Sequence, residues 1–341
     1  MNMELISKIK YSIDKFNLDL KDKIILTEGA TGDYISTPII ADLAGAKRVY
    51  AFEKESSYGS FEDIERGFRE YFKYNPNSNI KLIKSLDEIE DRIDIVTNVG
   101  LLRPIDKRVF DILDDNSVIS LMYEPWEFRE EDIDLELALK KGIRVYGTNE
   151  SDEKLKTMEY IGYTALYHLL DFKISPFSNK KILIVGNKEF TKPIERVLKS
   201  NGYRFKTIND YIKPFNNYDK ELAIIVAEHK RPILIVGESR DGAFINKDKL
   251  SKQDYIIHIC GNVDFNNIKS QHKPQNPKPF GYMSYRTDYI DSQAVVDLHT
   301  AGLLVGAGML EANRLNLPKE QYKKFMEQNY IALAFEDKRF W

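Results

Sequence analysis

The segment from residue 132 to residue 186 constrains the fold more than any other part of the chain. It reads as a polar turn and helix (DIDLELALKKG), a strand (IRVYGTNE), an amphipathic helix (KTMEYIGYTALYHLLDF) and a second strand that ends on one glycine (KKILIVG). Parallel strands need a crossover of this kind, with a helix between them. The helix at residues 157–172 is followed by ISPFSN, where proline and serine end helices, so we expect it to link two domains.

Strand-like runs alternate with helical stretches on both sides of this segment. The expected strands are residues 23–28, 48–53, 80–83, 93–98, 118–124 and 143–147, and then 181–186, 203–208, 222–228, 232–237 and 255–260. This alternation predicts an α/β fold with two doubly wound, mostly parallel sheets and a cleft between them. A chain of 341 residues is long enough for two separate cores.

The segment also carries a resemblance. In its Asp-Leu-Glu…Lys-Gly-Ile-Arg-Val run, its linking helix and its Lys-Lys-Ile-Leu-Ile-Val-Gly strand, it resembles the D-specific 2-hydroxyacid dehydrogenases and, more distantly, S-adenosylhomocysteine hydrolase. The resemblance implies two Rossmann-like halves: a discontinuous outer substrate domain (1–155 plus about 285–341) and an inserted nucleotide-binding domain (156–284). It also implies an NAD(P)-dependent oxidoreductase that acts on a small anionic 2-hydroxy or 2-oxo substrate.

Composition excludes several other classes of function. Lys plus Arg number 50 against 53 for Asp plus Glu, a net charge of -3 that offers no surface for nucleic acid. The single cysteine, Cys260, excludes an intramolecular disulfide and suits a reduced cytoplasmic compartment. No paired ligand spacing predicts a metal, and no apolar run reaches the roughly 20 residues that span a bilayer. Glycines in the apolar helix at residues 292–315 favour close helix packing or a homodimer.

Dinucleotide folds need glycines after the first strand, so that backbone amides approach the pyrophosphate. Here the turn is Gly186-Asn187-Lys188-Glu189-Phe190-Thr191, with one glycine, and a solvated turn is the alternative interpretation. In the late YIIHICGNVD strand and turn, Gly261 and Asp264 match the Asn-Ile-Gly-His-Phe-Asp pattern of the homocysteine hydrolases, and Asn262 stands where that pattern has histidine. The candidate contacts to NAD or NADP in this half are Gly186, Asn187, Lys188, Thr191, Asp210, Glu228, Cys260, Gly261, Asn262 and Asp264.

The first half carries a second nucleotide-site pattern, ILTEGATGDYISTP, with Glu53 at the end of the next strand. This spacing suits a nucleotide or S-adenosylmethionine, so the alternative function is a methyltransferase or other group-transfer enzyme. A third hypothesis is a non-catalytic ligand-binding descendant. The candidate residues of this alternative nucleotide or substrate site are Thr27, Glu28, Gly29, Thr31, Gly32, Thr37, Glu53, Asn98, Thr148 and Asn149, although Thr31 would also suit a helix cap.

Hydride transfer to a ketone needs a cationic anchor for the substrate carboxylate and a proton donor. The candidate catalytic residues are His258, His229, Arg103, Glu124 and Arg286. Arg103 would clamp an anion and Glu124 would act as a base. Arg286 falls, by order along the chain, where the late Thr-Pro-His segment of the dehydrogenases has its histidine. A histidine inside an apolar strand is also typical of a hydrogen-bonded core residue, which is the alternative for His258.

Overall fold

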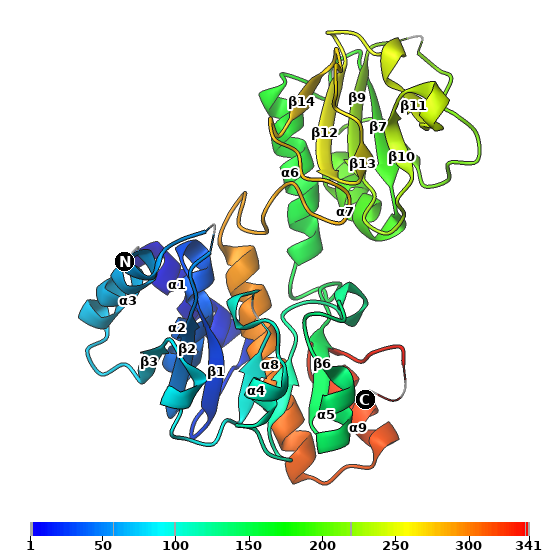
Figure 1. The fold of residues 1–341 in the computed structure, drawn as a ribbon. Coiled ribbons are helices and arrows are strands. Elements are labelled where there is room, and N and C mark those ends of the chain that lie inside the picture. Colours follow the sequence, from blue (N-terminus) through cyan, green and yellow to red (C-terminus); the bar gives the residue numbers. More distant parts are fainter. Residues whose placement is uncertain (1–2, 57, 99, 219, 338, 340–341) are drawn as a thin grey trace. The chain divides into compact units, whose positions relative to one another are not determined.

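The computed structural model describes residues 3–56, 58–98, 100–218, 220–337 and 339, and it divides into two compact units (Figure 1). Unit 1 comprises Met1–Leu155 and Ser292–Trp341, and unit 2 comprises Lys156–Asp291. The predicted α/β class is confirmed within each unit, because helices alternate with strands that pair in parallel, apart from one short antiparallel strand.

Unit 1 is built on a seven-stranded sheet with the order β15-β6-β5-β4-β1-β2-β3. Its strands are β1 (Ile24–Gly29), β2 (Arg48–Glu53), β3 (Ile80–Ile83), β4 (Ile95–Thr97), β5 (Val118–Ser120), β6 (Arg144–Thr148) and β15 (Ala332–Leu333). Only β15 runs antiparallel, against β6. The first six strands have the order 3-2-1-4-5-6 of doubly wound dinucleotide folds, in which ligands bind at the carboxyl ends of the strands where the order reverses. In unit 1 the reversal lies between β1 and β4.

Helices of unit 1 pack on this sheet and on one another. They are α1 (Met3–Phe16), α2 (Ser36–Leu43), α3 (Phe61–Tyr74), α4 (Lys107–Phe110), α5 (Leu135–Lys141), α8 (Gln293–Arg314) and α9 (Lys319–Asn329). The long helix α8 contacts α1, α2 and the strands β4, β5 and β6. A Cβ on Gly302 would lie 2.1 Å from Met122 Sδ, and one on Gly306 would lie 2.6 Å from Ile95 Cγ2. The glycines of this helix therefore allow close packing on the unit's own sheet.

Helix α8 is also the one helix, among the residues the structure describes, that is long and apolar enough to cross a membrane. Its most apolar window is 78% buried inside the fold, as is usual for the core helix of a soluble protein.

Unit 2 contains a five-stranded parallel sheet with the order β14-β12-β9-β7-β8 and a separate three-stranded sheet with the order β11-β10-β13. The strands of the large sheet are β7 (Lys181–Gly186), β8 (Phe205–Ile208), β9 (Leu222–Ala227), β12 (Tyr255–Cys260) and β14 (Gln271–Lys273). Those of the small sheet are β10 (Leu234–Gly237), β11 (Ile245–Asn246) and β13 (Asn262–Val263). The run at residues 232–237 is thus a strand, but our placing it in the main series was wrong, because β10 pairs with β11 and β13.

Counted within the unit, the large sheet has the order 2-1-3-4-5, which is that of flavodoxin-like folds and reverses between β7 and β9. Helices α6 (Thr157–Asp171) and α7 (Lys188–Ser200) pack together on one face of it. A second apolar cluster joins the large sheet to β10 and β11. Close packing of the two helices depends on Gly162, because a Cβ there would lie 2.7 Å from the carbonyl oxygen of Pro193.

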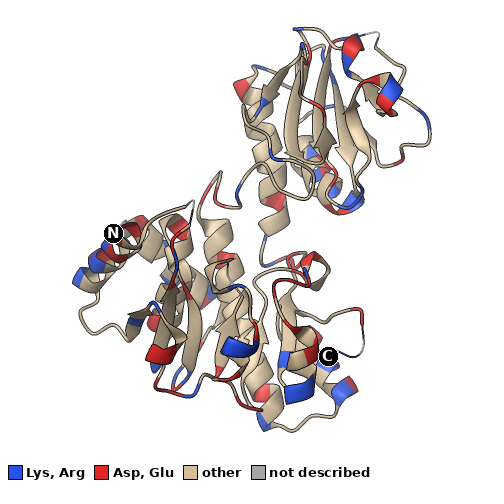
Figure 2. Cartoon of the chain, viewed as in Figure 1, with Lys and Arg blue, Asp and Glu red and all other residues tan. Residues whose placement is uncertain are grey.

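Charged residues of both signs are interspersed over the elements of each unit (Figure 2). This distribution matches the near balance of acidic and basic residues in the sequence.

Candidate functional site

Most of the residues predicted from the sequence as site residues lie near one of the two reversal points. In unit 2 they lie at or just after the carboxyl ends of β7, β8 and β9. In unit 1 they lie at or just after the carboxyl ends of β1, β2, β4, β5 and β6. The two edges differ in whether their polar groups are already satisfied.

Gly186 ends β7, and the neighbouring strand requires a glycine there. A Cβ on Gly186 would lie 1.9 Å from the carbonyl oxygen of Ala227, its partner on β9 in the parallel ladder. The one glycine of this turn therefore serves the packing of two strands, a role separate from the approach of a pyrophosphate to the backbone.

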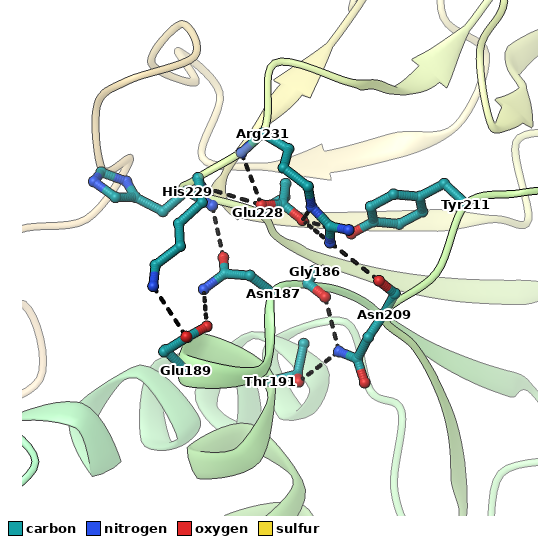
Figure 3. Close-up of polar contacts among 10 residues, drawn as sticks. Gly186, Asn187, Glu189, Thr191, Asn209, Tyr211, Glu228, His229 and Arg231 are labelled. Atoms are coloured by element: carbon teal, nitrogen blue, oxygen red, sulfur yellow. Dashed lines mark hydrogen bonds and ion pairs between the residues drawn. The ribbon is translucent and has the colours of Figure 1, made fainter.

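The first turn of α7 carries a carboxylate of its own (Figure 3). Asn187, just before the helix, accepts a hydrogen bond from the backbone N–H of His229 (2.8 Å) and donates one to Glu189 Oε2 (2.9 Å). Lys230 Nζ donates to Glu189 Oε1 (2.9 Å). The hydrogen bond from Asn187, helped by Lys230 and the residue's own backbone N–H, lowers the pKa of Glu189 to about 2. Glu189 is therefore ionised at neutral pH.

Glu228, directly after β9, is fully buried and satisfied by its neighbours (Figure 3). Its Oε1 accepts the backbone N–H groups of Lys230 (3.1 Å) and Arg231 (3.0 Å). Its Oε2 accepts the Tyr211 hydroxyl (2.8 Å) and two guanidinium nitrogens of Arg231 (2.5 and 3.1 Å). The Arg231 guanidinium lies 4.5 Å from the centre of the Tyr211 ring. The buried carboxylate of Glu228 is therefore balanced by an arginine whose side chain is 41% exposed.

Asn209, directly after β8, closes the same edge (Figure 3). Its Nδ2 donates to the Gly186 carbonyl (2.8 Å) and to Thr191 Oγ1 (3.0 Å), and its carbonyl accepts from Arg231 (3.1 Å). Three side chains predicted to hold a dinucleotide here, Asn187, Thr191 and Glu228, are thus hydrogen-bonded to other residues of unit 2.

These contacts test whether unit 2 fits a dinucleotide. In such folds the pyrophosphate occupies the start of the first helix, where backbone N–H groups and the helix dipole attract negative charge. In unit 2 the first turn of this helix carries the ionised carboxylate of Glu189, which repels a second anion. The side chains as they lie do not fit the pyrophosphate of NAD or NADP.

The catalytic candidate His258 and the cofactor candidates near β12 lie in the core or in a tight turn of unit 2. His258 is fully buried, with Nδ1 at 2.7 Å from Ser284 Oγ and Nε2 at 3.0 Å from the Gly261 carbonyl. Burial lowers the pKa of His258, so the ring is neutral. Cys260 is also fully buried, and burial raises the pKa of its thiol far above the ordinary value. Gly261 has a φ of +132°, a backbone conformation that residues other than glycine rarely adopt.

Other candidates of unit 2 lie on its surface or beside the small sheet. Asn262 Nδ2 donates to the Pro232 carbonyl (3.2 Å), and Asp264 pairs with Lys247. Lys188 is exposed, and the ring of His229 stacks on Phe190 with centroids 5.5 Å apart. Asp210 is exposed and lines a cavity of about 940 Å³, and Arg286 pairs with Asp288.

Glu28 is the first functional side chain at the edge of unit 1. It lies one residue before the end of β1, is 3% exposed and accepts the backbone N–H of Leu101. Burial raises the pKa of Glu28 to about 7, against the opposing effects of that hydrogen bond and of the Arg103 guanidinium. A carboxyl group with such a pKa exchanges a proton readily near neutral pH.

Arg103 is held in place beside this carboxyl group. Its Nε donates to the Asn98 carbonyl (3.1 Å), its Nη1 to Asp132 Oδ2 (3.1 Å), and the guanidinium lies 5.3 Å from the centre of the Tyr123 ring. The Tyr123 hydroxyl donates to the same Asp132 oxygen (3.2 Å). Nη2 forms no hydrogen bond to a described residue, so it is the donor open to an anion. The Arg103 side chain is 29% exposed.

Three buried polar atoms at this edge have no hydrogen-bond partner among the described residues: Ser36 Oγ, Glu53 Oε1 and Asn98 Nδ2. Their residues begin α2, end β2 and follow β4. Asn98 Nδ2 lies near the Tyr123 hydroxyl without hydrogen-bonding geometry. Buried polar groups in folded proteins are almost always paired, so unpaired ones mark the place of a ligand or an ordered water.

Glu53 occupies the position at which an acidic residue of dinucleotide folds accepts ribose hydroxyls. It is 2% exposed, its Oε2 lies 3.8 Å from Lys84 Nζ, and burial raises its pKa despite that lysine. A Cβ on Gly29 would lie 3.3 Å from Glu53 Cγ, and Gly32 has a φ of +61°. The glycines of the Gly29–Gly32 turn thus make room for Glu53 and for the backbone of the turn.

The hydroxyl candidates of unit 1 have partners inside the protein. Thr97 Oγ1 donates to Thr27 Oγ1 (2.7 Å), Thr37 Oγ1 lies 2.6 Å from His299 Nδ1, and Thr148 Oγ1 donates to the Leu121 carbonyl (2.8 Å). Thr31 Oγ1 donates to the Tyr58 carbonyl (3.0 Å), and Asn149 Oδ1 accepts the Ser151 N–H (3.2 Å). Thr27 and Thr148 therefore hold segments of the sheet edge together, whereas Thr37 joins α2 to α8.

Carboxyl groups after β5 and β6 form a further part of this edge. Glu124 accepts hydrogen bonds from Trp126 Nε1 and from the Ser151 N–H. Burial and Glu124 raise the pKa of Glu127 to about 7, and burial and Glu127 raise the pKa of Glu150 well above its ordinary value. Glu127 and Glu150 share a hydrogen bond, so one of them is protonated at neutral pH.

Sequence reasoning missed several groups of this edge. Ser36, Asp132 and the Glu127–Glu150 pair were not among its candidates. To find them one must know which loops lie side by side in space although they are far apart in the chain. Only the order of the strands in the sheet gives that information.

A scan against protein-family models gives no match to this chain, and a search of curated proteins gives none either. Among solved structures, a dipicolinate synthase chain from Bacillus subtilis is 13% identical, with 88% of this chain and 98% of that chain covered and a TM-score of 0.48. A dipicolinate synthase chain from Bacillus halodurans is 12% identical, with 88% and 100% covered and a TM-score of 0.47.

D-lactate dehydrogenase with NAD⁺ from Lactobacillus jensenii is 12% identical, with 84% of this chain and 97% of that chain covered and a TM-score of 0.43. With TM-scores below 0.5, the likeness transfers neither residues nor chemistry to this chain.

Proposed function

We propose that this protein is an NAD(P)-dependent oxidoreductase that acts on a small anionic 2-hydroxy or 2-oxo substrate, and that the nucleoside of the cofactor is held by unit 1. One observation carries the proposal: the unpaired Oε1 of Glu53 at the end of β2, in a sheet with the strand order of dinucleotide folds. The unpaired Oγ of Ser36, at the start of α2, adds a donor on the same side of β1.

The residues of unit 1 fit the nucleoside half of such a cofactor. Ribose hydroxyls would donate to Glu53, and the Gly29–Gly32 turn would bring backbone N–H groups toward the phosphates. Unit 2 lacks this fit because the first turn of α7 carries the carboxylate of Glu189 and because Glu228 is satisfied by Arg231. When bound, the nicotinamide ring would supply or accept the hydride.

The chain itself would bind the substrate and move the proton. Arg103 would bind the substrate carboxylate through Nη2, while Asp132 and Tyr123 fix the plane of the guanidinium. Reduction of a ketone to an alcohol requires one proton at the oxygen, and oxidation releases it. Glu28 would donate and accept this proton, because a pKa of about 7 makes both forms available at neutral pH.

A second candidate is S-adenosylmethionine-dependent group transfer at the same edge of unit 1. It is favoured by the acidic side chains around the turn, Glu28, Asp33 and Glu53, since a sulfonium cation is attracted by negative charge and a pyrophosphate is not. This candidate uses Glu53 for the same ribose but has no need of a proton carrier with a pKa near 7.

Calorimetric titration with NAD, NADH, NADP, NADPH, S-adenosylmethionine and S-adenosylhomocysteine tests both candidates. We expect a nicotinamide dinucleotide to bind the wild type and the affinity to fall at least about tenfold in Glu53→Gln, which keeps the size of the side chain and removes its charge. Glu228→Gln is the matched change in unit 2 and should leave the affinity unchanged. If Glu228→Gln loses dinucleotide binding and Glu53→Gln does not, the cofactor site lies in unit 2 and the proposal is wrong. If only S-adenosyl ligands bind, group transfer is favoured over hydride transfer.

A further inference from the structure

A second cavity lies entirely within unit 2, between the end of α6 and residues 273–289. Its volume is about 600 Å³. Its lining is rich in rings: Tyr167, His168, Tyr285 and Tyr289. The proposed function makes no use of it.

Two of these rings carry buried polar atoms without partners. His168 is 2% exposed, and neither of its ring nitrogens has a hydrogen-bond partner among the described residues. The hydroxyl of Tyr285, which is 8% exposed, also has none. Burial lowers the pKa of His168 to about 4, so the neutral ring offers one donor and one acceptor. Three unpaired atoms beside one cavity indicate a missing polar partner.

The charged side chains that line the cavity form ion pairs with one another. Lys273 Nζ lies 3.1 Å from Asp171 Oδ2, and Arg286 pairs with Asp288. Two cations and two anions line the cavity, and each cation is held by a carboxylate. An ionic ligand would have to break one of these pairs, so the wall favours an uncharged ligand.

The aromatic rings that line the cavity already contact one another, and a further ring could join this group. Tyr289 stacks on His168 with centroids 5.5 Å apart and planes 28° apart, and it contacts Tyr285 at 4.6 Å. Tyr289 is 44% exposed, so one side of this group of rings faces solvent. A planar ligand would stack on one of these rings and turn its edge to the unpaired atoms of another, because the donors and acceptors of a ring lie in its own plane.

We propose that this cavity binds an uncharged planar heteroaromatic ring of the nucleobase class. Such a ring supplies both things that the site lacks, a π face for the aromatic wall and an edge of hydrogen-bond donors and acceptors for His168 and Tyr285. The site is separate from the edge of unit 1 and does not depend on the proposed cofactor.

The test is a titration of the full chain with uridine, cytidine and guanosine, each to about 5 mM, followed by calorimetry. It is made in the Glu53→Gln variant, so that a nucleoside site in unit 1 is weakened. We expect at least one nucleoside to bind, and Tyr285→Phe and His168→Phe to weaken that binding by about tenfold or more, because each variant keeps a ring and removes the unpaired atoms. Tyr163→Phe, on the exposed side of α6, is the control and should change nothing.

Thermal unfolding of the same variants separates this proposal from a purely structural role. Removal of an unpaired buried polar atom alone would raise or preserve Tm and leave nucleoside affinity unchanged, and that result would overturn the proposal. The absence of binding of all three nucleosides, or binding that the wild type shows and Glu53→Gln loses, would overturn it too. Should His168→Phe fail to fold, Tyr285→Phe decides alone, since it removes one oxygen and no ring.

Discussion

Asn187 Nδ2 lies 2.9 Å from Glu189 Oε2, so the residue that precedes α7 fixes a carboxylate over the first turn of that helix. Unit 2 thereby carries at its own reversal point the negative charge that a bound phosphate would otherwise bring. Unit 1 has the opposite character at its reversal point, where buried polar atoms of Ser36 and Glu53 are unpaired. The two α/β units thus differ at their reversal points. In unit 2 the polar side chains there are paired with one another or with neighbours, and in unit 1 some of them are unpaired.

The Asn187–Glu189–Lys230 contact should stabilise unit 2 in a pH-dependent way. The pKa of Glu189 is lowered from 4.5 to about 2, so its contribution is fully present above pH 4.5 and is lost as the pH falls toward 2. The side chain is 48% exposed, which limits the contribution to about 1 kcal/mol. Urea unfolding of the wild type and Glu189→Gln should differ by this amount at pH 7 and converge below pH 3.

Glu195→Gln, further along α7, controls for the loss of one negative charge in that experiment. An unchanged difference between the wild type and Glu189→Gln from pH 7 to pH 3 would contradict the role assigned to the carboxylate. The same variant also bears on the cofactor. Removal of this charge should leave NAD(P) affinity unchanged if unit 1 holds the nucleotide, and should tighten it if unit 2 does.

Gly186→Ala tests whether the one glycine of the β7–α7 turn serves folding. Its Cβ would lie 1.9 Å from the Ala227 carbonyl oxygen, and backbone cannot move aside as a side chain can. We expect a loss of about 1–3 kcal/mol in the free energy of unfolding, measured by urea denaturation. Gly29→Ala is the comparison, because its Cβ would meet a side-chain atom, Glu53 Cγ, at 3.3 Å and should cost less. Equal stability of Gly186→Ala and the wild type would refute this account.

Much of the fold follows from sequence periodicity. The runs at residues 48–53, 80–83 and 181–186 match β2, β3 and β7 to the residue, because apolar runs bounded by glycine or charged residues define buried strands well. Periodicity does not state which strand a run pairs with. For that reason residues 232–237 were assigned to the large sheet, although β10 pairs with β11 and β13.

Site residues were predictable only as strand ends. Glu28 and Glu53 were found because they lie in the last residues of strands, and Asn98 and Arg103 because they come after one; parallel strands bring their carboxyl ends to one edge. Whether such a residue is free or satisfied depends on partners distant in the chain. Asp132 and Glu228 illustrate this, since the first holds Arg103, 29 residues away, and the second accepts the hydroxyl of Tyr211, 17 residues away. No spacing in the sequence states either pairing.

Arg103→Met should act on substrate binding more than on the chemical step. The variant keeps the apolar length of the side chain over Tyr123 and removes the guanidinium donors. For 2-oxo acids such as glyoxylate and pyruvate, we expect KM to rise about 10- to 100-fold with a smaller change in kcat, because a charge-assisted pair is lost equally in the ground and transition states. Arg108→Met removes an exposed arginine that pairs with Asp106 and should leave KM unchanged. A fall in kcat at constant KM would contradict the anchoring role.

Glu28→Gln should change both stability and activity with a pH dependence set by its raised pKa. Because the pKa is raised from 4.5 to about 7, the folded state prefers the protonated carboxyl, so stability is highest below pH 4.5 and declines as the pH rises to about 7. The buried charge then costs at most about 3 kcal/mol, from 1.36 kcal/mol per pKa unit. Glu28→Gln removes that cost, and its unfolding free energy should exceed that of the wild type at pH 8 and approach it at pH 4.

Activity should respond in the opposite direction. As the carrier of the substrate proton, Glu28 should give the pH profile of kcat/KM an inflection near pH 7 that disappears in Glu28→Gln, with a fall of about 10²- to 10⁴-fold at the optimum. Glu124→Gln, whose carboxylate accepts from Trp126 and the Ser151 N–H, is the comparison at the same edge and should keep the inflection. If Glu28→Gln is both more stable at pH 8 and less active, then the wild-type carboxyl group serves the reaction at a cost to the stability of the fold. Retention of full activity by Glu28→Gln, with the inflection in place, would assign the proton to another group.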